Sequence, residues 1–218
     1  MESVRSNLVP MIVLWSFALA LVCAYFLLPG LSGTLEALAK RQALDGWLPA
    51  FANRFVFAGL VPGFFLLTVK SIRPPHPLAV ALAQGVWCGV WGIVCNWFYE
   101  LQAWAFGAGA GLATLALKTA VDQFVWTVLV IAPVNGAFFL WMGQDFSFAR
   151  TRRVWPRRFC RDLVLPMLVP NWCLWIPVVF VVYAFPLPLQ IQVSGLALSV
   201  SMLLSLRIGC LAGKEPSP

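Results

Sequence analysis

KTAVDQFVWTVLVIAPVNGAFFLW, residues 118–141, sets a charged group of residues directly against a long apolar run. Lys118 and Asp122 are four residues apart, so on a helix they share a face and can form an ion pair. Gln123 adds hydrogen-bond donors and acceptors to that face. Ionisable groups at bilayer depth are costly, so they usually face protein or water and indicate a functional site. The alternative is an apolar span that begins only at Phe124, with Lys118 and Asp122 among the lipid headgroups, where their cost is small.

The composition indicates an integral membrane protein. Hydrophobic residues make up 61% of the chain and charged residues 11%, against about 25% charged residues in typical soluble domains. A chain of 218 residues has room for about six spans of roughly 20 residues each and no second folded domain. The expected fold is all-α: a polytopic transmembrane helical bundle with about six apolar segments and four to six spans. Residues 1–218 are expected to form a single integral membrane domain.

Small residues and prolines suggest how these segments pack. Ala81, Gly85 and Gly89 form two overlapping small-xxx-small steps, which allow another helix to approach closely. Pro62 and Pro133 predict kinks within their spans. The stretch 33–54 is mixed in character and is expected to be a surface helix at the interface. The predicted apolar segments are 8–28, 55–69, 78–98, 124–141, 163–185 and 193–206.

A basic loop separates the fourth and fifth apolar segments. Trp155 and Phe159 are interleaved with its arginines, which could suggest nucleic acid, but a basic loop between two spans is typical of an anchor on anionic lipid headgroups. We therefore expect the lipid bilayer as partner and no nucleic acid. The positive-inside rule places this loop and both termini in the cytoplasm or its equivalent. The arginines are Arg150, Arg152, Arg153, Arg157, Arg158 and Arg161.

No catalytic or metal-binding pattern is recognisable. The single histidine, His76, has no Cys, Asp or Glu nearby to complete a metal shell. The chain has no GxSxG motif and no paired aspartates within one span. The cysteines lie mostly in apolar runs, where they behave as small hydrophobic residues. We expect no enzyme, no cofactor and no metal, and the sequence leaves a monomer and a homo-oligomer both open.

The region 96–207 resembles the Mpv-seventeen and peroxisomal membrane protein family of small multipass membrane proteins. LKTAVDQ, at 117–123, is similar to the family's lysine followed by Asp-Gln at the start of a span. NWCLWIP, at 171–177, is similar to its Asn-aromatic-aromatic-Leu-Trp-Pro element, with Ile176 inserted. WFYELQAW at 97–104, Pro188-Leu189 and LLS at 203–205 resemble further family elements. Two positions depart from the pattern: Tyr183-Ala184 replaces the usual Asn-Phe pair, and Gln192 replaces a basic residue.

The resemblance implies a location and a class of function. Family members are associated with mitochondrial inner, peroxisomal and other organelle membranes, and are proposed to form pores or to pass small metabolites. The bacterial inner membrane is an equally compatible location for this chain.

Two functional hypotheses follow from the polar residues in the spans. In the first, the protein is a channel or facilitator for small solutes, and prolines in the same spans expose backbone along a polar path. In the second, it is a structural or regulatory membrane protein whose polar residues hold helices together. The candidate pore or polar-network residues are Lys118, Asp122, Gln123, Asn135, Asn171 and Trp175.

Overall fold

The computed structural model describes residues 2–68 and 74–212, and within these ranges the chain is helical and contains no strand. The elements are α1 (Glu2–Leu27), α2 (Pro29–Ala43), α3 (Leu48–Arg54), η1 (Phe55–Leu60), α4 (Val61–Thr68), α5 (Pro77–Phe106), α6 (Leu112–Ala120), η3 (Val121–Ile131), α7 (Ala132–Gly143), α8 (Phe148–Val154), η4 (Cys160–Val164), α9 (Leu165–Ala184) and α10 (Leu187–Ala212), where η marks π-helical segments.

The apolar helices confirm a multipass integral membrane protein. In the described part of the chain, four continuous helices are long and apolar enough to cross a bilayer: Leu48–Phe65, Pro77–Phe106, Leu112–Gly143 and Cys160–Ala184. A fifth span results if α1 and α2, which meet at 100°, are counted as one broken span. The apolar part of α10, Leu187–Met202, is shorter. The predicted all-α polytopic bundle is confirmed, although the second and fourth spans begin earlier than expected, at Leu48 and Leu112.

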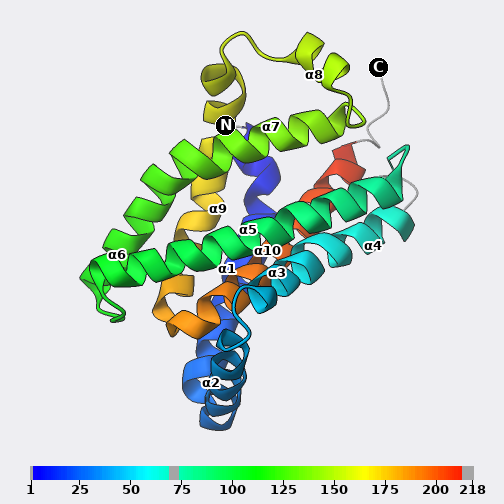
Figure 1. Cartoon of the computed structure of the whole chain (residues 1–218). Coiled ribbons are helices and arrows are strands. Elements are labelled where there is room, and N and C mark those ends of the chain that lie inside the picture. The colour runs from blue at the N-terminus through cyan, green and yellow to red at the C-terminus, as the bar shows by residue number, and fades with distance from the viewer. Residues whose placement is uncertain (1, 69–73, 213–218) are drawn as a thin grey trace.

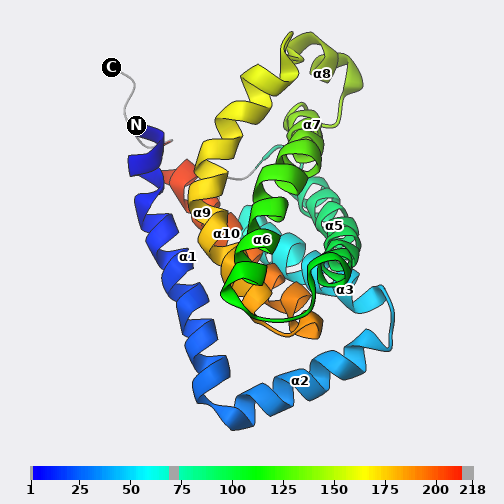
Figure 2. The ribbon, with the colours of Figure 1, turned by 90° about the vertical axis from the view of Figure 1, so that its left-hand side faces the viewer.

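The two ends of the bundle carry different elements. The short helix α8, which belongs to the basic loop, lies at one end together with the beginning of α1 (Figures 1 and 2). Helix α2 lies at the opposite end and runs across the foot of α1 (Figure 2). The Tyr25 hydroxyl of α1 donates a hydrogen bond to the Glu36 carboxylate of α2. The predicted interfacial surface helix over 33–54 is wrong for residues 48–54, because these begin the span Leu48–Phe65 and bury Ala50 and Arg54.

A proline follows each π-helical segment at the same spacing. Segments η1, η3 and η4 end at Leu60, Ile131 and Val164, and Pro62, Pro133 and Pro166 stand two residues further on. Proline lacks an amide hydrogen, and its ring clashes with the carbonyl four residues earlier in an α-helix. A wider π turn moves that carbonyl away from the ring. The predicted distortions at Pro62 and Pro133 are therefore present as π-helical turns within continuous helices.

Glycines let α5 lie against α3 and η1. A Cβ added to Gly59 would meet the Gly85 Cα at 2.2 Å, and one added to Gly92 would meet the Ala50 carbonyl oxygen at 2.2 Å. Neither position therefore has room for a side chain. The small-residue pattern predicted this kind of packing for the third apolar segment, and the structure identifies the partner as the preceding span.

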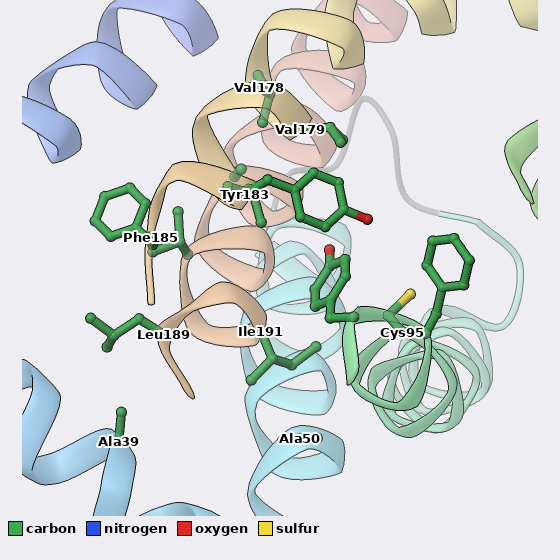
Figure 3. Close-up of a cluster of buried hydrophobic side chains, with 14 of the residues drawn as sticks. Ala39, Ala50, Cys95, Val178, Val179, Tyr183, Phe185, Leu189 and Ile191 are labelled. Atoms are coloured by element: carbon green, nitrogen blue, oxygen red, sulfur yellow. The ribbon is translucent and has the colours of Figure 1, made fainter. Parts of the chain in front are cut away.

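The main core lies between the carboxyl-terminal helices and the rest of the bundle. Val178, Val182 and Tyr183 of α9 pack with Leu189 and Ile191 of α10. Figure 3 shows Tyr183 extending from α9 toward α5, the helix that carries Cys95. This core fixes the position of the Tyr183 hydroxyl against the middle of the bundle.

Candidate functional site

A cavity of about 200 Å³ lies within the bundle. Its wall is built from side chains of α3, α5, η3, α7, α9 and α10. Much of the wall is aromatic, with Trp87, Trp91, Phe98, Trp126 and Phe139. Nearly all of the candidate residues chosen from the sequence also line it: Asp122, Gln123, Asn135, Asn171 and Trp175.

Asp122 is the acceptor at the centre of a buried hydrogen-bond network. Tyr183 Oη donates to Asp122 Oδ2 at 2.8 Å, and Gln123 Nε2 donates to Asp122 Oδ1 at 2.8 Å. Gln102 Nε2 of α5 donates to Tyr183 Oη at 3.3 Å. The carboxylate is 5% exposed. Burying the Asp122 carboxylate without hydrogen-bond donors would cost several kcal/mol. The bonds from Tyr183 and Gln123 therefore make its position inside the bundle possible.

The network continues from Gln123 to α9. Asn171 Nδ2 donates to Gln123 Oε1 at 3.5 Å, and Trp172 Nε1 donates to the Gln123 carbonyl at 2.9 Å. This carbonyl lies in η3, where π-helical geometry changes the usual backbone pairing. Trp172 was not among the candidate residues from the sequence, although it stands next to Asn171 in the NWCLWIP element.

Asn135 and Trp175 lie on other parts of the same wall. Asn135 Oδ1 accepts a hydrogen bond from Trp87 Nε1 at 2.7 Å. The Trp87 ring in turn stacks on Phe138, with centroids 4.0 Å apart and planes 2° apart. Trp175 is partly buried and packs against the main core. Asn135 thus adds a polar group to the wall beside Asp122 and Gln123, and Trp175 adds an aromatic ring.

Lys118 does not line the cavity, and its expected ion pair with Asp122 is not formed. Its side chain is buried, 2% exposed, with Nζ 5.7 Å from the centroid of the Tyr183 ring. Its carbonyl accepts a hydrogen bond from Gln102 Nε2 at 3.1 Å. The expectation was wrong because Tyr183 and Gln123 occupy the Asp122 oxygens. The helix also begins at Leu112 and not at Phe124, and protein covers both charged side chains.

Arg54 is the functional candidate that the sequence did not reveal. It ends α3, is 7% exposed and lines the cavity. Its Nη2 donates to Ser194 Oγ of α10 at 2.8 Å. In the sequence Arg54 closes a mixed, interfacial stretch, so it resembles a solvated residue. Its burial depends on the close approach of α3 to Gly92, where the Arg54 side chain passes.

The predicted lipid-contact arginines are exposed around α8 and the turn that follows it. Arg150, Arg152, Arg153, Arg157, Arg158 and Arg161 are all exposed. Arg150 Nη1 forms an ion pair with Asp145 Oδ2 at 3.1 Å. Trp155 and Phe159 stack with centroids 4.7 Å apart and line a hollow with Arg152 and Arg157. The segment thus combines free cations with an aromatic surface, as membrane-interface segments do.

Within the described ranges, no group of three or more His, Cys, Asp or Glu side chains is placed to hold a metal ion. Comparison of the chain with protein-family models, with curated proteins and with solved structures finds no match.

Proposed function

We propose that this integral membrane protein binds a small organic solute in the central cavity and facilitates its passage across the membrane. The observation that carries the proposal is the shared wall of the cavity: Asp122, Gln123, Asn135 and Asn171 come from three different helical stretches and converge on one space inside apolar spans. Polar groups at such depth are expensive unless they serve the fold or a ligand.

A facilitator is a better match to this wall than an open ion pore. A few polar groups share the wall with indole and phenyl rings, which make up much of the remainder. Binding sites for small organic molecules have this character, with a few polar groups set in an apolar wall. The resemblance to the Mpv-seventeen and peroxisomal membrane protein family supports the same proposal. On this proposal the chain acts in an organelle membrane, as the resemblance implies, or in a bacterial inner membrane, which is equally compatible.

The test is solute flux in liposomes that contain the purified protein. Erythritol, choline and methanesulfonate are suitable probes, because they are neutral, permanently cationic and permanently anionic and leak slowly through lipid. We expect protein-dependent efflux of at least one of them with no steady ionic conductance. Asp122→Asn is expected to reduce that efflux, while Asp162→Asn, at an exposed carboxylate, is expected to leave it unchanged. Folded protein without any efflux would contradict the proposal.

The hydrogen-bond network supports a second candidate function, that of a structural or regulatory membrane protein. The bonds from Tyr183 to Asp122, from Asn171 to Gln123 and from Trp172 to the Gln123 carbonyl join η3 to α9. Interhelical bonds of this kind contribute about 0.6 kcal/mol each on average, which is enough to help hold a bundle together. On this hypothesis Asp122→Asn lowers thermal stability in detergent and no flux is observed with either protein.

A further inference from the structure

Two hydrogen-bond donors on the cavity wall have no partner. Among the residues that the structure describes, Arg54 Nε and Trp126 Nε1 are buried side-chain nitrogens without a hydrogen bond. Both residues line the cavity. The Trp126 ring is fixed by stacking on Phe98, with centroids 4.4 Å apart and planes 9° apart. A buried donor without an acceptor is costly, so each such group requires an explanation.

Among the described residues, no carboxylate forms a close ion pair with Arg54, although Asp122 attracts it from a longer distance. The acidic side chain on the described part of the wall is Asp122, and no Arg54–Asp122 contact within 4 Å is formed there. Both Asp122 oxygens already accept hydrogen bonds, from Tyr183 and Gln123. Ser194 gives Arg54 a neutral acceptor only. A buried guanidinium is stable when it is paired with an anion and fully hydrogen-bonded.

We propose that the cavity binds the carboxylate of a small organic monoanion, held by Arg54 and by the Trp126 indole nitrogen. The inference rests on the proposed function, because it names the solute class that the facilitator recognises. Arg54 Nε and Trp126 Nε1 both lack hydrogen-bond acceptors. A carboxylate supplies two acceptor oxygens, and a planar guanidinium can donate parallel hydrogen bonds to them. Arg54 is the cationic side chain among the described wall residues. Because Asp122 on the same wall opposes further negative charge, a singly charged carboxylate is a better match than a doubly charged phosphate ester.

The remainder of the solute is expected to be apolar. Trp87, Trp91 and Trp175 line the same cavity as Arg54 and Trp126. Indole rings bury apolar area and stack on flat groups. A cavity of about 200 Å³ limits the ligand to a small molecule, so an aryl or short alkyl carboxylate is the expected class.

The test is binding of 3-phenylpropionate to the full-length protein in detergent, measured by isothermal titration calorimetry. Its amide, 3-phenylpropionamide, has nearly the same shape without the charge, and 3-phenylpropylamine has the opposite charge. Both also partition into micelles, so they control for that effect. We expect the carboxylate to bind at least about tenfold more tightly than either analogue, as a charge-assisted hydrogen bond allows.

Matched variants connect that binding to the two donors. Arg54→Lys keeps the positive charge but loses the planar guanidinium that donates two parallel hydrogen bonds. We expect affinity for the carboxylate to fall about tenfold. Trp126→Phe removes the five-membered part of the indole, including its nitrogen, and keeps a six-membered ring on Phe98. We expect affinity for the carboxylate to fall about threefold or more, with the weak affinity for the amide unchanged. Trp104→Phe, at a side chain that is 84% exposed, should change nothing. If Arg54→Lys does not fold, Trp126→Phe alone still decides the question.

Equal binding of carboxylate and amide, tighter binding of the amine, or unchanged affinity in Trp126→Phe would overturn the inference. Failure of the inference and failure of the proposed function give different results. Selective carboxylate binding without flux in liposomes leaves the binding site standing and contradicts the facilitator. Flux of choline or erythritol by a protein that does not bind the carboxylate supports the facilitator and contradicts the carboxylate site.

Discussion

Tyr183 Oη donates a hydrogen bond to Asp122 Oδ2 at 2.8 Å, across 61 residues of sequence. The bond ties α9 to η3 on the wall of the cavity. The aspartate and the tyrosine are therefore best tested as a pair.

A double-mutant cycle with Tyr183→Phe and Asp122→Ala is expected to give a coupling free energy of about 0.6–1.7 kcal/mol, the range of interhelical hydrogen bonds in membranes. The measurement is the free energy of unfolding in detergent for both single variants and the double variant. Tyr25→Phe with Asp122→Ala is the control cycle, because Tyr25 bonds to Glu36 and shares no partner with Asp122. Additive effects of Tyr183→Phe and Asp122→Ala would show that the bond contributes nothing.

Lys118→Met is expected to leave the melting temperature unchanged or to raise it, because it replaces a buried ammonium that has no carboxylate partner by an apolar side chain of similar length. Lys118→Glu is expected to destabilise the protein, since it places a second carboxylate one helical turn from Asp122. Lys40→Met, at an exposed position of α2, is the control and is expected to change stability by less than about 0.5 kcal/mol. A marked loss of stability in Lys118→Met would indicate that the ammonium has a stabilising role.

Gly59→Ala is expected to destabilise the protein by about 1–3 kcal/mol or more, because the added methyl group meets the Gly85 backbone. Gly33→Ala is the matched control within α2, where a Cβ meets no atom within 4 Å. That change is expected to stabilise the helix by roughly 0.5–1 kcal/mol. Thermal unfolding in detergent measures both, and similar stabilities of the two variants would contradict the close approach of η1 and α5.

Arg152→Gln is expected to weaken retention of anionic lipid by about 1 kcal/mol, roughly fivefold in affinity. Arg150→Gln is expected to have a smaller effect, because Asp145 already balances the Arg150 charge. Native mass spectrometry with phosphatidylglycerol and a zwitterionic reference lipid measures both effects. If the two variants lose lipid equally, or if added salt has no influence, the lipid-anchor interpretation of the basic loop is wrong.

Composition and apolar segments were enough to predict the fold class, and the polar residues within those segments were enough to find most of the polar side chains of the cavity wall. Asp122, Gln123, Asn135 and Asn171 are informative because a polar group inside an apolar run needs a partner, and partners gather in the interior. That reasoning depends only on which residues stand inside a span. It does not depend on which helices are neighbours.

The features that sequence reasoning missed all depend on distant contacts. Arg54 looks like part of an interfacial stretch until Gly92 and Ser194 are seen beside it. The Lys118–Asp122 pair was plausible from helical spacing, but Tyr183 and Gln123 already satisfy the aspartate. The π-helical turns were anticipated only as kinks, because proline identifies the site of a distortion and not its form.

The contact between Gly59 and Gly85 has a mechanical consequence. Two backbones that touch without side chains between them cannot slide past each other without a clash, so α3, η1 and α5 behave as one rigid unit. Side chains, and not bare backbone, join α5 to η3 and α7 through the Phe98–Trp126 and Trp87–Phe138 stacks. Relative movement of the spans is therefore least expected where Gly59 meets Gly85.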